Sequence, residues 1–253
     1  MPKIFSISVL LIISVTFWGQ PDSKRDNLRL NDSVKLDPFY FTLGTLWDYI
    51  GRFTYVNKNS QVDRYYSYEK PLIYYLDSMI KKELNIDITI IPDDEKNVAR
   101  YETFSPELST KINTFFKENH LIIDSLKNLP QLNYSYLAGR YYRYGKKIND
   151  SIYAIQIANS SDHTICDSLL RRIGCTKIHF KYLKNIPAQF IYYFIPTNEL
   201  ERYFNYLSKE KKELDDSYNA EFGSRFKFND TTLKKVEEIK EKKYQEIIDL
   251  FRQ

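Results

Sequence analysis

Residues 134–158 read YSYLAGRYYRYGKKINDSIYAIQIA, and this stretch decides the expected fold. It contains two runs rich in Tyr, Leu and Ile, residues 134–144 and 151–158. Asn149 and Asp150 lie between the runs, and these residue types are typical of tight turns. Because strand-forming runs on either side of a turn pair with each other, the stretch predicts a β-hairpin.

A second pair of strands is expected further along the chain. Residues 176–184 (TKIHFKYLK) and 189–195 (QFIYYFI) are rich in aromatic and β-branched residues, and they flank a break at Asn185-Ile186-Pro187. The segment between residues 158 and 176 is long enough for a crossover between parallel strands. We therefore predict a small sheet of four strands, either mixed or antiparallel.

Helices are expected before, between and after these strands. Each has a start signal followed by apolar residues at a spacing of three or four. The expected helices begin at Asp37-Pro38, Pro71, Ser105-Pro106, Thr164, Asn198 and Asp230. Pro130 is expected to end the third of them.

The predicted fold class is α+β, with the small sheet covered by helices. Residues 37–130 form a mainly helical region and residues 131–253 an α+β region, and we expect the two to make one compact unit.

The first residues have the layout of an export signal. Lys3 precedes an apolar run, Ile4 to Trp18, which is shorter than the ~20 residues that cross a membrane. We predict a signal peptide over residues 1–19, cleaved before Gln20, and a loose polar leader over residues 20–36. The mature protein is then secreted or periplasmic. The alternative is an uncleaved membrane anchor at residues 4–18.

Composition argues against several functions. The formal net charge is only +4, and this mild charge predicts no nucleic-acid partner. Glycine-rich phosphate loops are missing from the sequence. The three histidines, His120, His163 and His179, lack the spacing of zinc ligands, so no metal and no cofactor are expected.

Two groups of residues are weak catalytic candidates. Ser161, Asp162 and His163 lie in a predicted loop after a strand, where active-site residues often occur. Cys166, at a predicted helix start, with His179 on the next strand, resembles the arrangement in papain-like hydrolases. Spacing also places Cys166 on the apolar face of its helix and His179 on the polar face of its strand. A purely structural interpretation of both groups is therefore favoured.

The cysteines Cys166 and Cys175 flank a predicted helix, which places their Cα atoms about 13 Å apart. A disulfide needs less than about 7 Å. The sequence therefore favours two free thiols.

The stretch GRYYRYGKK (139–147) suggests a binding surface, although the favoured interpretation is an amphipathic strand with tyrosines at the rim of the core. Strand alternation would place Arg140 and Tyr142 on one face and Arg143 on the other. Either face could join Lys177 and Lys181 of a neighbouring strand and contact an envelope component, a glycan or a protein.

The leading functional prediction is a non-catalytic binding module of the cell envelope. One alternative is an exported hydrolase with an unrecognised site. The other is a membrane-anchored partner protein that retains residues 4–18.

Overall fold

The structure is a computed structural model that describes residues 34–47, 52, 55, 57–93, 100–118, 120–126, 128–158, 162–225 and 230–253. The predicted signal peptide, most of the predicted leader and Ser161 lie outside the described residues. Export therefore stays a prediction. Among the described residues, no helix has the length and apolar character needed to span a membrane.

The described chain contains both helices and strands along its whole length. The α-helices are α1 (Pro38–Thr45), α2 (Lys70–Leu84), α3 (Pro106–Asn113), α4 (Pro130–Tyr144), α5 (Asp162–Arg172), α6 (Asn198–Tyr206), α7 (Ser208–Arg225) and α8 (Asp230–Arg252). Short 3₁₀ helices are η2 (Ser67–Glu69) and η3 (Ile123–Ser125). The strands are β1 (Gln61–Tyr66), β2 (Thr89–Asp93), β3 (Arg100–Phe104), β4 (Phe116–Lys117), β5 (His120–Leu121), β6 (Gly145–Lys147), β7 (Tyr153–Ala158), β8 (Thr176–Leu183) and β9 (Gln189–Ile195).

The α+β class is confirmed, and every described strand pair is antiparallel. The predicted sheet is present as four strands in the order β6-β7-β9-β8. Three of its members match the strands expected at 151–158, 176–184 and 189–195. β9 lies between β7 and β8 and runs antiparallel to both, so β7 and β8 run parallel to each other without being neighbours. The segment between them, which contains α5, is therefore the expected crossover between parallel strands.

The expected strand at 134–144 is instead the helix α4. Pro130 occupies the first turn of this helix, where a missing N–H costs nothing, so it begins a helix rather than ending one. The many tyrosines suggested a strand. In the structure, almost every residue from Asn133 to Arg143 is buried inside the fold. A helix that is buried on all sides has no polar face and hence no amphipathic stripe to reveal it.

The N-terminal half contains more strand than expected. β1 pairs with β3, and β3 pairs with β2, giving a second sheet of order β1-β3-β2. The expected long helix after Pro106 is short, since α3 ends at Asn113 and the two-stranded pair β4-β5 follows.

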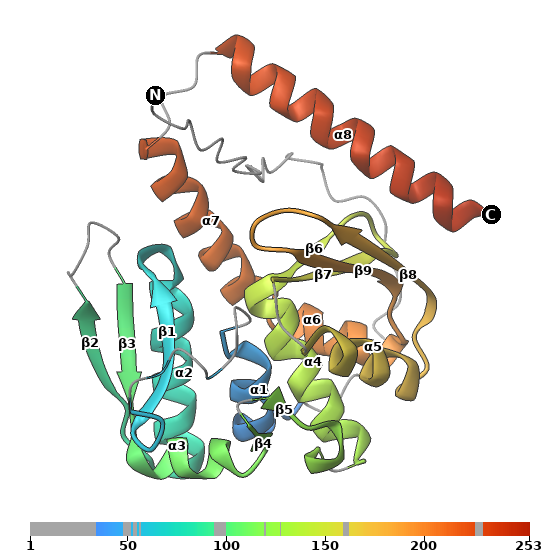
Figure 1. Cartoon of the computed structure of the whole chain (residues 1–253). Coiled ribbons are helices and arrows are strands. Elements are labelled where there is room, and N and C mark those ends of the chain that lie inside the picture. The colour runs from blue at the N-terminus through green and yellow to red at the C-terminus, as the bar shows by residue number, and fades with distance from the viewer. Residues whose placement is uncertain are drawn as a thin grey trace, which may run out of the picture. The chain divides into compact units, whose positions relative to one another are not determined.

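Two glycines allow α1 and α4 to pack backbone against backbone. A Cβ atom at Gly139 would lie 2.2 Å from the carbonyl oxygen of Phe41, and one at Gly44 would lie 2.1 Å from the carbonyl oxygen of Tyr136. Because carbon and oxygen atoms cannot approach so closely, only glycine fits at either position. α4 also packs against α5, α6 and β7, so it is the central helix of this part of the fold (Figure 1).

Residues Val34–Tyr218 form one compact unit. It holds both main sheets and two clusters of buried apolar side chains, one around Leu137 and Phe194 and the other around Phe41 and Tyr142. α8 belongs to a second unit. Ile247 and Phe251 of this helix are buried, and its exposed residues include many charged side chains together with Ile239 and Leu250.

Candidate functional site

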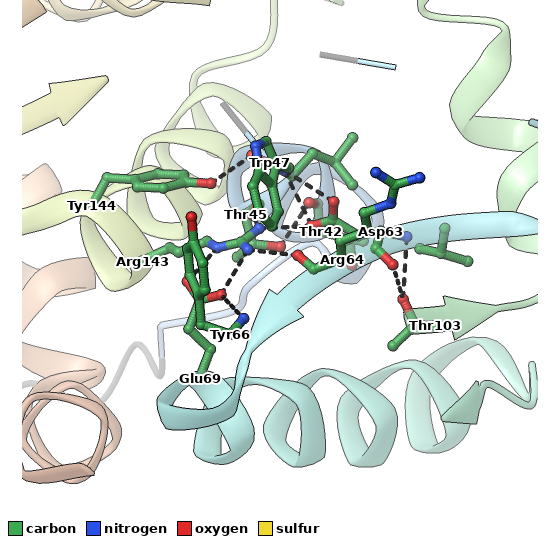
Figure 2. A network of polar contacts seen from close by, with 12 residues as sticks. Thr42, Thr45, Trp47, Asp63, Arg64, Tyr66, Glu69, Thr103, Arg143 and Tyr144 are labelled. Atoms are coloured by element: carbon green, nitrogen blue, oxygen red, sulfur yellow. Dashed lines mark hydrogen bonds and ion pairs between the residues drawn. The ribbon is translucent and has the colours of Figure 1, made fainter. Parts of the chain in front are cut away.

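A buried ionic network surrounds Arg143 at the C-terminal end of α4 (Figure 2). The Nε and Nη2 atoms of Arg143 donate to the two carboxylate oxygens of Glu69, at 2.7 and 2.8 Å. Nη1 donates to Asp63 at 2.7 Å and to the carbonyl of Thr45 at 2.6 Å, and Nη2 also donates to the carbonyl of Arg64 at 2.7 Å. All five N–H groups of the guanidinium therefore have acceptors.

Asp63 connects this network to β1 and to the chain after α1. Its carboxylate accepts from the backbone N–H of Trp47 at 3.1 Å and from the hydroxyl of Tyr55. Arg52 lies over the Tyr55 ring at 4.8 Å and donates to backbone carbonyls, among them that of Val62. Two buried arginines, Arg52 and Arg143, thus lie near two buried carboxylates, those of Asp63 and Glu69.

Arg140 makes a second buried ion pair, one turn earlier on α4. Its Nη2 donates to Asp162 at the start of α5, Nη1 donates to the carbonyl of Leu46 at 3.1 Å, and Nε donates to the hydroxyl of Tyr136 at 3.2 Å. The last carbonyls of a helix lack partners within the helix and carry its negative dipole end. Arg140 and Arg143 therefore cap α1 with positive charge.

Both arginines remain charged in this environment. Burial alone would lower the pKa of Arg143, but Glu69, Tyr144 and Asp63 together hold that pKa well above its usual value. The same balance, with Tyr136 and Asp162 as the main partners, raises the pKa of Arg140. The ion pairs of both arginines therefore persist at neutral pH, where their role is structural.

The predicted binding residues on GRYYRYGKK are accordingly in the interior. Arg140 and Tyr142 are fully buried, and Arg143 is buried by the network. Tyr142 packs edge-on against Tyr75 with ring centroids 5.6 Å apart. None of these three side chains presents a surface to a ligand in this structure. Lys177 and Lys181, on β8, are exposed.

Asp162 and His163, predicted to lie in a loop, begin α5 together with Cys166, whereas His179 lies on β8. Asp162 is engaged by Arg140. Cys166 is fully buried in α5. His179 pairs with Tyr193, one position away from Phe180, which stacks with His163 on the side of the sheet where α5 lies. Since neighbouring strand residues point to opposite faces, His179 points away from Cys166.

We expect neither cysteine to react in the folded protein. Both thiols are free, and burial raises the pKa of Cys166 to about 12 and that of Cys175 to about 11. Because the thiolate is the reactive form, a maleimide at about pH 8 should label the native protein slowly and both thiols after denaturation. Mass spectrometry measures the labelling, and a Cys166→Ala variant assigns it. Stoichiometric labelling of Cys166 in the folded protein would contradict its buried placement.

An exposed group of aromatic rings lies where β8 and β9 meet the start of α5. We call His163, Phe180, Tyr182 and Phe190 the aromatic platform. His163 stacks on Phe190 with ring centroids 3.9 Å apart and an interplanar angle of 11°. Phe180 and Tyr182 lie 6.2 and 5.3 Å from the same Phe190 ring, and they are 51% and 47% exposed.

His163 is held in place by a second contact, between its Nδ1 atom and the hydroxyl of Tyr192 at 3.0 Å. Burial lowers the pKa of His163, and the carboxylates of Asp162 and Asp167 offset only part of that effect. The ring is therefore a neutral stacking partner at neutral pH.

The part of the sequence that contains β8 and β9 carries positive charges and no negative ones. From Arg171 through Asn198 the sequence has five basic residues and no Asp or Glu. The five, here called the basic stretch, are Arg171, Arg172, Lys177, Lys181 and Lys184, and all are exposed. Among the described strands β8 pairs only with β9, so side chains from both faces of β8 border one free edge. Sequence reasoning singles out Lys177 and Lys181 but not the rings beside them.

Within the described ranges, no group of three or more His, Cys, Asp or Glu side chains is arranged to hold a metal ion. The carboxylates at the centre of the fold, Asp63, Glu69 and Asp162, are already engaged by arginines.

Comparisons with known proteins gave matches among solved structures alone. No protein-family model and no curated protein matches the chain. The homing endonuclease I-DmoI in complex with DNA and Ca is 14% identical, with 65% of this chain and 85% of that chain covered and a TM-score of 0.43. Full-length DUF199/WhiA from Thermatoga maritima is 13% identical, with 84% and 69% covered and a TM-score of 0.43. The N-terminal LAGLIDADG domain of DUF199/WhiA is 14% identical, with 68% and 86% covered and a TM-score of 0.39.

These matches correct two predictions from the sequence. The leading prediction of a non-catalytic envelope module and the exclusion of a nucleic-acid partner are both contradicted, because the similar structures include a DNA-bound endonuclease. The exclusion relied on the net charge of the whole chain. Net charge does not reveal how charge is distributed, and the basic stretch concentrates five cations in a segment that has no acidic residue.

Proposed function

We propose that this protein binds nucleic acid through the aromatic platform and the basic stretch. The observation that carries the proposal is the coincidence of half-exposed rings with five exposed cations on a segment without acidic residues. Lysine and arginine neutralise phosphates, and flat rings stack on bases. A surface of this composition suits a ligand that carries both groups.

The proposal concerns binding and not cleavage. Divalent-metal catalysis of phosphate chemistry uses carboxylate oxygens that are available to the ion. In the part of the chain that the structure describes, the central carboxylates Asp63, Glu69 and Asp162 are engaged by arginines.

The arrangement of charge around β8 supports phosphate binding from more than one side. Lys181 follows Phe180 and precedes Tyr182, so its side chain leaves the opposite face of the same edge strand. Arg171 approaches from α5, and its charge influences the hydroxyl of Tyr192 beneath the platform. The edge is thus flanked by cations on both faces, which suits a strand of phosphates that runs along it.

Charge reversal at two lysines, one on β8 and one directly after it, tests the proposal. We expect Lys181→Glu/Lys184→Glu to weaken binding of a fluorescein-labelled oligonucleotide of about 16 nucleotides by roughly tenfold or more at about 50 mM salt. The slope of log K against log salt should also become shallower, by about 0.7 for each phosphate of a single strand that the protein no longer neutralises. Fluorescence anisotropy measures both quantities.

The matched control is Lys82→Glu/Lys117→Glu, which changes the net charge equally on the exposed surfaces of α2 and β4. It should bind nearly as the wild type does. Equal weakening by the two double variants, or no binding by the wild type, would refute the proposed surface.

A further inference from the structure

We propose that the ligand of this surface is a single strand whose unpaired bases stack on Phe180 and Tyr182. This inference rests on the proposed function and narrows it. Single-stranded and duplex nucleic acids share phosphates, so the basic stretch alone does not distinguish them. The aromatic platform does, because the face of a base is accessible only where the base is unpaired.

Three features of the platform favour stacking. The exposed rings are two residues apart on one strand, so both stand on the same face of the sheet. Their planes lie within 20° and 33° of the Phe190 ring, so neither is turned edge-on to it. Both stay about half-exposed after the chain has folded, which leaves ring surface for a ligand.

The platform is also supported from below. Phe190 is stacked on His163, which is held by Tyr192. Tyr192 is itself buried and lies 5.2 Å from Phe180. Rings fixed in this way lose little conformational freedom when a base stacks on them, so binding costs less entropy than it would on a mobile side chain.

Exposed hydrophobic rings on an edge strand promote aggregation unless other groups protect them or a ligand covers them. Lysines are one common protection, and Lys181 serves that role whether or not a ligand binds. Lysines do not account for two large rings remaining half-exposed on the other face. Charge complementarity with the basic stretch selects an anionic occupant rather than a neutral or basic peptide, and the exposed rings favour a strand that carries flat bases beside its phosphates.

Three probes separate this inference from the proposed function: a labelled single strand of about 16 nucleotides, the same sequence as a duplex, and an abasic strand with the same number of phosphates. We expect the wild type to bind the single strand about tenfold or more tightly than either other probe. Phe180→Ala and Tyr182→Ala should each weaken binding of the single strand about fivefold or more, with little change for the abasic strand.

Controls keep the test specific. Tyr74→Ala removes an equally exposed tyrosine from α2 and should leave all three affinities unchanged. Phe180→Trp retains a stacking ring and should restore binding of the single strand. Thermal unfolding of each variant checks that the half-exposed substitutions leave the fold intact.

The outcomes are distinct. If the single strand, duplex and abasic strand bind equally and Phe180→Ala has no effect, the single-strand inference is wrong, and of the proposed function only nucleic-acid binding by the basic stretch stands. If a sulfated glycan competes as well as the base-containing strand, the surface recognises charge alone and the single-strand inference is wrong. If no probe binds, both proposals fail.

Discussion

Gly139→Ala should destabilise the protein by about 3 kcal/mol or more, or prevent folding altogether. The added Cβ would lie 2.2 Å from the carbonyl oxygen of Phe41 and 3.1 Å from the Cα of Gly44. Both neighbours are backbone atoms, so no rotamer change relieves the clash and α1 must move away from α4. That movement also pulls the end of α1 away from Arg140 and Arg143.

The sign of this effect discriminates between two physical expectations. Helix propensity alone predicts that alanine at a helical glycine stabilises by about 1 kcal/mol, whereas the close approach of the two backbones predicts a large destabilisation. Urea unfolding followed by circular dichroism measures the difference.

Gly174→Ala is the glycine control for that experiment. Gly174 has a positive φ of 86°, which strains alanine, but its new Cβ would have open space, with the nearest atom at 3.8 Å. Its cost should be about 1–2 kcal/mol. A Gly139→Ala variant no less stable than Gly174→Ala would mean that the two helices do not touch as described.

Arg143→Met should cost about 3–5 kcal/mol of folding free energy. Methionine fills much of the same volume, but it leaves Glu69 and Asp63 in the interior without their cation. It also removes the donors to the carbonyls of Thr45 and Arg64. Uncompensated buried charge is among the most destabilising changes that a single substitution makes.

Two comparisons isolate the charge effect. Arg171→Met breaks an exposed pair with Asp167 and should cost at most about 0.5 kcal/mol. Glu69→Gln should cost less in the Arg143→Met background than in the wild type, because it then removes an unpaired charge. Similar costs for Arg143→Met and Arg171→Met, or additive effects of Arg143→Met and Glu69→Gln, would count against the network.

Local features of the fold could be predicted from the sequence. The α+β class and the strands β7, β8 and β9 follow from strand-forming runs bounded by turn residues. The starts of α1 and α3 follow from a capping side chain and an adjacent proline, and Asp37 and Ser105 do accept the predicted backbone hydrogen bonds. Signals of this kind lie within a few residues of the element they define.

The parts that the sequence did not predict depend on distant residues. α4 was mistaken for a strand because its environment is apolar on every side, and that environment comes from other elements. The role of Arg143 was hidden for the same reason, since its partners at Thr45, Asp63 and Glu69 are 74 to 98 residues away. Phe180, Tyr182 and Phe190 became a candidate surface only when strand pairing brought them to His163.

The long sequence separation in the Arg143 network has a consequence for biosynthesis. While a ribosome is still adding residues 105–144, Asp63, Glu69 and the carbonyl of Thr45 lack their hydrogen bonds from Arg143, and Arg52 is the only one of the two buried arginines already present. The N-terminal sheet therefore cannot complete its core alone, and it waits for α4 for several seconds at about 5–20 residues per second. During translation, the nascent chain depends on solvent or on chaperones to cover the surface that α4 later buries.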